Sequence, residues 1–138
     1  MIGLDTNILA RYYTDDDADA EAQRQRLAAR RLIESGQPSM VSKSAILELE
    51  WVRRGYYCFA QAEVASVMPH LLEQPHITVE DRDAVVRALS NREAGIDFAD
   101  ALHHASYKSC GSVAMFDDRK FARRAKKLGL APAVVVAS

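Results

Sequence analysis

Short apolar runs alternate with amphipathic stretches along the whole chain. Five runs have the length and the apolar character of buried strands: residues 2–4, 39–41, 77–79, 112–116 and 133–136. The stretches between them carry apolar residues at helical spacing and predict helices at residues 7–13, 18–34, 43–54, 59–72, 81–94, 97–109 and 118–128. Alternation of this kind favours an α/β fold, with a short parallel sheet flanked by helices. Because the strands are short and apolar, we expect helices to cover both faces of the sheet.

Composition limits the number of domains and the class of protein. A chain of 138 residues with 49% hydrophobic and 27% charged positions is typical of one soluble globular domain, so we expect residues 1–138 to form a single domain. No apolar run approaches the roughly 18 residues of a membrane span, and we expect a cytoplasmic protein. The net charge of −1 hides an acidic run at residues 15–21 and a basic run at residues 119–127. A local phosphate-binding face is therefore compatible with a nearly neutral chain.

The two cysteines, Cys58 and Cys110, have no spacing that indicates a metal site or a disulfide framework. We expect both thiols to be reduced and packed. With no cluster of cysteine and histidine in the sequence, zinc is not indicated.

Two acidic residues directly follow predicted strands. Asp5 comes after the first strand and Asp117 after the fourth. The carboxyl ends of parallel strands share one edge of a sheet, where open α/β proteins place their sites. Two carboxylates that face one crevice repel each other and need a cation or a proton between them.

Two further acids, Glu48 and Asp100, lie within otherwise apolar helical stretches. An acid on a half-buried face is costly unless it is paired or binds a metal. Mg²⁺ and Mn²⁺ prefer carboxylate and water oxygens, and such an ion activates water and neutralises phosphate charge during phosphodiester hydrolysis. Taken singly, however, an acid at such a position more often caps a helix or lies in a solvated loop.

Four segments together resemble the motifs of PIN-domain proteins, in particular the VapC-type toxins of bacterial toxin–antitoxin pairs. They are MIGLDTNILARYYTDDD, SAILELEWVRRGYY, GIDFADALHHASYKSCG and VAMFDDRKFARRAKKLG, in this order across nearly the whole chain. The resemblance implies a three-layer α/β/α PIN-like fold and an endoribonuclease dependent on Mg²⁺ or Mn²⁺. It also implies an RNA substrate, a VapB-like antitoxin as partner and a homodimer.

The resemblance also implies roles for particular residues. Carried over position by position, the catalytic and metal-binding acids are Asp5, Glu48, Asp100 and Asp117. Glu50 is the competing choice in the second motif, although its offset from the neighbouring tryptophan fits less well. Supporting roles near the metal fall to Thr6, Asn7 and Asp97, each of which is alternatively a helix cap.

Other side chains have two interpretations each. Arg119 and Arg123 are our candidates for RNA backbone contacts, against a purely solvated face. His103 and His104 are candidates for acid–base chemistry, although packed or surface roles are more common. An aromatic cluster favours core or dimer packing, with a partner helix or a stacked base as the alternative. Its members are Trp51, Tyr56, Tyr57 and Phe59.

Three rival functions fit parts of the pattern. A phosphatase of the haloacid-dehalogenase type needs a second aspartate where this chain has Asn7. A phosphoacceptor signalling domain needs paired acids after the first strand and a lysine after the last, and neither is evident. A PIN-domain protein with a non-toxin RNA-processing role shares the same acids, so the sequence leaves it open.

Overall fold

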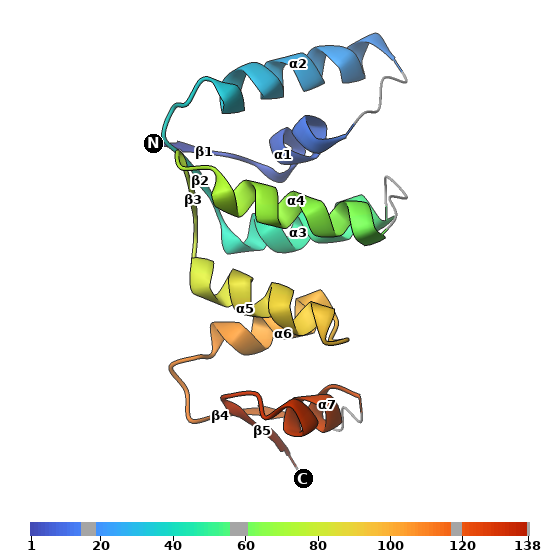
Figure 1. The fold of residues 1–138 in the computed structure, drawn as a ribbon, viewed down its shortest axis with the longest axis vertical. Helices are drawn as coiled ribbons and strands as arrows, with labels where there is room; N and C mark the ends of the chain where they lie inside the picture. The colour runs from blue at the N-terminus through green and yellow to red at the C-terminus, as the bar shows by residue number, and fades with distance from the viewer. Residues whose placement is uncertain (15–18, 56–60, 117–119, 138) are drawn as a thin grey trace. The chain divides into compact units, whose positions relative to one another are not determined.

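The computed structural model describes residues 1–14, 19–55, 61–116 and 120–137, and shows helices alternating with short parallel strands (Figure 1). The chain divides into two compact units, Met1–Glu80 and Asp81–Ser138. Each unit has its own parallel strands and helices and is described by itself.

The first unit is built on a three-stranded parallel sheet. Its strands are β1 (Ile2–Gly3), β2 (Ser39–Val41) and β3 (Ile77–Val79), with β2 in the centre. The register pairs Ile2 with Ser39 and Ser39 with Ile77. The helices of this unit are α1 (Thr6–Tyr13), α2 (Ala20–Glu34), α3 (Lys43–Gly55) and α4 (Gln61–Glu73).

The core of the first unit forms where apolar faces of its helices and strands meet. Helix α1 packs against α2 and α3, and its Leu9 is fully buried, as are Ile46 and Leu49 of α3. Val41 of the central strand has no exposed surface. This packing holds the start of α1 and the start of α3 at the carboxyl ends of β1 and β2.

The second unit contains a helical pair and a two-stranded parallel sheet. Helices α5 (Arg82–Glu93) and α6 (Phe98–Ser106) pack along each other, with Phe98 buried between them. Gly95 joins them at φ +100°, a conformation that favours glycine. Strands β4 (Ser112–Met115) and β5 (Ala133–Val136) pair in parallel, and α7 (Phe121–Leu128) packs against β5.

The prediction of an α/β fold with short parallel strands and flanking helices is confirmed. Three predicted strands have the expected ends: residues 39–41, 77–79 and 133–136. The strands do not form one ladder, because the hydrogen bonds of β1 run to β2 and those of β4 run to β5, in separate sheets. Within the second unit, α7 packs against β5, and Val135 and Val136 are exposed.

Helix ends are less well predicted than helices. Helix α6 ends at Ser106, three residues before the predicted end, because the chain turns at Tyr107, whose carbonyl accepts from the Cys110 N–H at 2.8 Å. Helix α4 runs through Pro69 and ends at Glu73, one residue past the predicted end. Helix α7 begins at Phe121, and the predicted start at residue 118 lies outside the described residues.

The expectation that both thiols are packed is wrong for Cys110, which is a free and exposed thiol. Trp51 is 70% exposed, so the core alternative is wrong for it, and dimer packing stays a prediction. The aromatic residues Tyr56, Tyr57 and Phe59 and the second cysteine, Cys58, lie outside the described residues. No helix in the described ranges is long and apolar enough to cross a bilayer.

Candidate active site

Asp5 stands where β1 gives way to α1. Leu4, just before it, is buried and donates its N–H to the Met40 carbonyl of β2 at 2.8 Å. Asp5 has the extended backbone of an N-cap, and its carbonyl accepts from the N–H groups of Ile8 and Leu9. Its carboxylate makes no capping hydrogen bond and is exposed. The capping interpretation therefore holds for the backbone of Asp5 and not for its side chain.

Thr6 and Asn7 differ in their surroundings. Thr6 is buried at the first position of α1, whereas Asn7 is exposed one residue later. Of the two, only Asn7 presents its polar side chain to solvent beside the Asp5 carboxylate.

Helix α3 places Glu48 and Glu50 on different faces. The helix starts after Ser42, whose hydroxyl accepts the Ala45 N–H at 3.1 Å. Successive residues are about 100° apart around a helix, so Glu50 falls on the buried face with Ile46 and is 5% exposed. Glu48 points the other way and is exposed.

The two glutamates differ in burial, which corrects the prediction of a half-buried Glu48 and separates Glu48 from Glu50 as candidates. Glu48 does not lie on a half-buried face, because the apolar residues next to it in sequence point away from it. Glu50 is the buried acid and has an interaction partner within the fold. Only the Glu48 carboxylate is open to solvent, a cation or a phosphate.

Glu80 is an acid at the same sheet edge that sequence reasoning missed. It follows β3, and its carboxylate accepts the Lys43 N–H at the first residue of α3 at 2.8 Å. Its own N–H donates to the Val41 carbonyl at 2.9 Å. Glu80 is thus committed to holding the start of α3 against the sheet. Glu80 directly follows a predicted strand, as Asp5 and Asp117 do, so the rule used for those two residues could also have identified Glu80.

In the second unit, α6 carries Asp97 and Asp100. Asp97 is the N-cap residue, with its carbonyl accepting the Ala101 N–H at 2.9 Å, but its side chain makes no capping bond. Asp100 lies in the first turn, where a negative charge complements the helix dipole. It is exposed, so the expectation of a half-buried face is wrong here also, because Phe98, Ala101 and Leu102 form the buried side.

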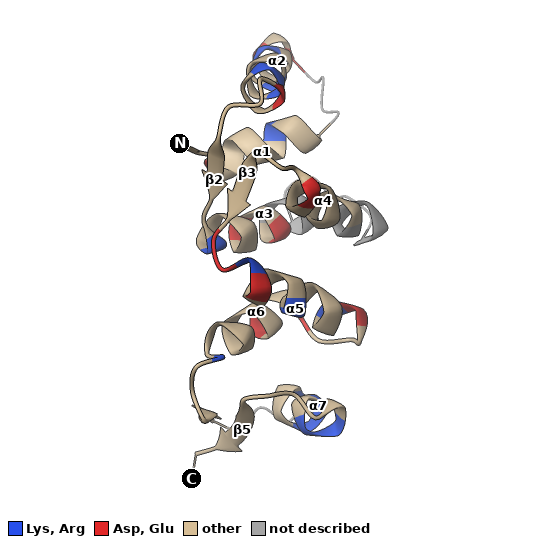
Figure 2. Ribbon diagram, turned by 60° about the vertical axis from the view of Figure 1, so that its left-hand side comes forward, with Lys and Arg blue, Asp and Glu red and all other residues tan. Residues whose placement is uncertain are grey.

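The fourth motif is described only in part. Asp117 and Arg119 lie outside the described residues. Phe116, directly before them, is 83% exposed. Every charged residue within α7 is basic, as Figure 2 shows, and Arg123 is exposed on it. Arg124 donates to the Gly95 carbonyl, so that cation is engaged within the unit.

The two histidines of α6 have different roles. His104 is 3% exposed, with its Nε2 bonded to the Pro132 carbonyl at 2.7 Å and its ring edge-on to Phe121. His104 thus joins α6 to the first residue of α7 and to Pro132, just before β5. The packed interpretation is therefore correct for His104. His103 is exposed.

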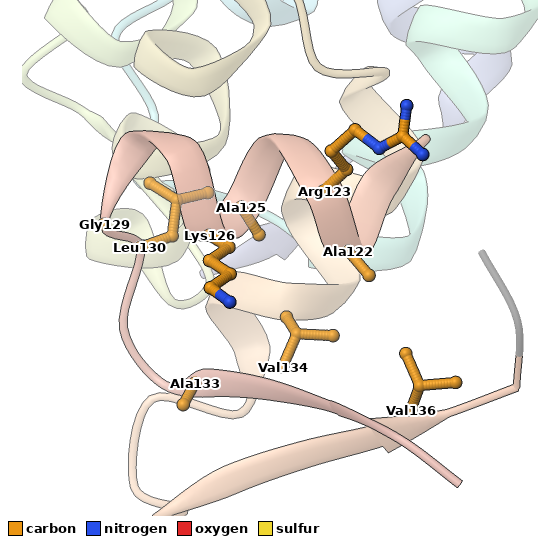
Figure 3. A pocket seen from close by; sticks show the side chains of 9 residues that line it. All are labelled: Ala122, Arg123, Ala125, Lys126, Gly129, Leu130, Ala133, Val134 and Val136. Atoms are coloured by element: carbon orange, nitrogen blue, oxygen red, sulfur yellow. The ribbon is translucent and has the colours of Figure 1, made fainter. Parts of the chain in front are cut away.

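A pocket of about 630 Å³ lies between α7 and β5. In Figure 3, Val134 and Val136 rise from β5 toward the helix, Lys126 extends toward the strand, and the Arg123 guanidinium points away from it. The pocket lining is otherwise apolar, and none of the described candidate acids contributes to it. The pocket therefore contains Arg123, a candidate for RNA contacts, and none of the described candidate acids.

Within the described ranges, no group of three or more His, Cys, Asp or Glu side chains is placed to hold a metal. The candidate acids are divided between the two units and the residues outside the described ranges. Asp5 and Glu48 belong to the first unit, Asp100 belongs to the second, and Asp117 is not described. A shared four-acid centre stays a prediction.

Comparison with known proteins adds one finding. A family model described as PIN domain matches residues 2–127. Neither the curated proteins nor the solved structures give a significant match. The matched segment contains all four candidate acids.

Proposed function

The chain belongs to the PIN domain family, and from this premise we propose that it is an endoribonuclease dependent on Mg²⁺ or Mn²⁺. PIN domains are generally nucleases, and PIN-domain nucleases generally use divalent metal ions. The observation that carries the proposal is the extent of the match, which spans residues 2–127 and so includes every candidate acid. Membership in this family leaves the phosphatase and phosphoacceptor alternatives without support.

We propose that Asp5, Glu48, Asp100 and Asp117 hold the ion. Four carboxylates suit a hard cation. Asp5 and Glu48 fit this role because each has an exposed carboxylate, and that of Asp5 is not used to cap its helix. When bound, the ion lowers the pKa of a water molecule and neutralises the charge on the phosphate.

Other residues orient the four acids or contribute positive charge that attracts RNA. We assign Asn7 and Thr6, which follow Asp5, and Asp97, one turn before Asp100, to orienting the acids. Arg119 and Arg123 hold the RNA backbone through its phosphates, which gives affinity without reading sequence.

As the biological role, we propose the toxin of a toxin–antitoxin pair, acting on RNA in the cytoplasm. The four motifs that resemble VapC-type toxins support this role. A VapB-like antitoxin would bind the chain and hold the activity in check, and the active form would be a homodimer.

Cleavage of RNA by the purified chain tests the nuclease. We expect cleavage with Mg²⁺, none with EDTA, and a loss of about 100-fold or more in Asp5→Asn. Glu93→Gln, an exposed acid at the end of α5, is the matched control and should cleave normally. Metal-dependent cleavage that survives Asp5→Asn would disprove the proposed site.

Expression in a bacterial host tests the toxin. We expect growth to stop, and to resume when a neighbouring small gene is co-expressed. Normal growth with an active nuclease would instead assign the chain a non-toxin role in RNA processing.

A further inference from the structure

Trp51 is the one tryptophan of the chain, and 70% of it is exposed on α3. Tryptophan usually buries much of its large apolar ring, so this exposure leaves apolar surface in water. A single exposed apolar residue is common on proteins. What Trp51 does depends on its neighbours.

The neighbour that matters is Glu48, three residues earlier on the same helix. Residues at this spacing lie side by side, with Cβ atoms about 5–6 Å apart. Both side chains are exposed, and Ser44, one turn before Glu48, is exposed too. The buried face of α3, with Ile46 and Leu49, lies on the other side of the helix. A flat aromatic ring and a candidate metal-binding acid thus share one exposed stripe.

We propose that Trp51 is an RNA-binding residue that stacks on an unpaired base next to the phosphate held at Glu48. The inference rests on the proposed nuclease function, which brings RNA to this carboxylate. Stacking needs only the open face of a ring and accepts any base. Because RNA is cleaved at its backbone, a base held beside Glu48 sets which phosphate reaches the acids.

The composition of the stripe favours a base over a protein partner. The centre of a protein interface is depleted of charged residues and surrounds its aromatic anchors with further apolar groups. Here the described residues on the same side of the helix are the exposed Ser44 and Glu48 and the half-buried Leu47, so a carboxylate and a hydroxyl lie beside the ring and the one apolar neighbour is partly covered. A negative charge beside the ring suits a nucleotide whose phosphate is reached through a bound cation.

The fluorescence of this single tryptophan gives a direct measurement. We would titrate the chain with a single-stranded oligouridylate at low salt, with Ca²⁺ in place of Mg²⁺, because Ca²⁺ also takes carboxylate ligands, and gel analysis would confirm that the oligomer stays intact. Tryptophan emission should be quenched with saturation, and a duplex of the same length should quench it far less. Binding measured by anisotropy of labelled RNA should weaken about 5- to 150-fold in Trp51→Ala, which corresponds to about 1–3 kcal/mol of stacking.

Two variants serve as controls for folding and for aromatic character. Trp51→Phe keeps a ring and should retain most of the affinity, and Tyr107→Ala removes an exposed aromatic residue from the second unit and should change nothing. Because Trp51 is exposed, both Trp51 variants should melt at the wild-type temperature.

The outcomes separate this inference from the nuclease itself. Normal cleavage with no quenching, and with unchanged affinity in Trp51→Ala, overturns the role of Trp51 and leaves the nuclease intact. Quenching and weaker binding in Trp51→Ala without any metal-dependent cleavage support the stacking and overturn the nuclease. A blue shift that depends on protein concentration and needs no RNA shows that Trp51 faces a second copy of the chain, and overturns the inference.

Discussion

Replacing Glu48 and Glu50 one at a time by glutamine should separate activity from stability. Glutamine keeps the size of the side chain and removes its charge. Glu48 is exposed, so Glu48→Gln should change the free energy of unfolding by less than about 0.5 kcal/mol. It removes a proposed metal ligand, and cleavage should fall about 100-fold or more.

The second substitution should do the reverse. Glu50 is 5% exposed and interacts with another residue of the fold. Glutamine removes the charge on which an interaction of a buried carboxylate depends, so Glu50→Gln should destabilise the chain by about 2 kcal/mol. Cleavage by the folded fraction should stay near the wild-type rate.

Urea unfolding and initial cleavage rates measure the two effects. For an m-value of about 2 kcal/mol per molar urea, the Glu50 variant should unfold at about 1 M less urea, and the Glu48 variant at the wild-type midpoint. Cleavage is compared well below both midpoints, with Glu93→Gln as the control. An active Glu48→Gln beside a stable, inactive Glu50→Gln would refute our choice between the two acids.

Three further outcomes test the packing of each unit. His104→Ala should lower the free energy of unfolding in urea by about 2–4 kcal/mol, because it leaves the buried Pro132 carbonyl without its donor and creates a cavity. His104→Gln keeps a donor and should lower it less. Equal losses in the two variants would contradict the hydrogen bond. Gly95→Ala should lower the free energy of unfolding by about 1–2 kcal/mol, because alanine is strained at the positive φ of this position. Gly3→Ala should leave the free energy of unfolding nearly unchanged, because a Cβ added at Gly3 would meet open space. Burial, and then a nearby carboxylate, raises the pKa of Tyr12, so its contribution to stability is complete below about pH 10 and is lost as pH rises through the raised value. Tyr12→Phe should therefore lose less stability than the wild type above about pH 10, measured by urea unfolding at each pH. Identical stability–pH profiles of the two proteins would disprove this contribution of Tyr12.

The strands were predictable because their signal is local. Residues 39–41 and 77–79 are short apolar runs between turn residues, and the structure gives them the predicted ends. Helix ends were less predictable than strands. The predicted end of α6 at residue 109 misses the turn at Tyr107, whose carbonyl accepts the Cys110 N–H. The start of α3 at Lys43 was predicted, although the Glu80 carboxylate that holds it lies 37 residues away in the chain.

The candidate site was predictable in its residues but not in its surroundings. We judged Glu48 and Asp100 half-buried from their apolar neighbours in sequence. Burial follows the face of a helix, however, and adjacent residues are about 100° apart. Residues three and four positions apart share a face, as Glu48 and Trp51 do, and both of these are exposed.

The acids of the described chain also differ in what they contribute to the fold. Asp19 caps α2 by accepting the Ala22 N–H at 2.7 Å, and Glu80 accepts an N–H at the start of α3 at 2.8 Å. Asp5 and Asp97 occupy the same kind of N-cap position without such a bond. A capping side chain contributes about 0.5–2 kcal/mol, and Asp5 and Asp97 leave that stabilisation unused. A carboxylate that stands at a helix start, exposed and not used for capping, is explained better by a ligand than by folding. By this criterion Asp5 is a candidate ligand without any motif, and Asp97 joins it as a candidate, because its backbone alone caps α6.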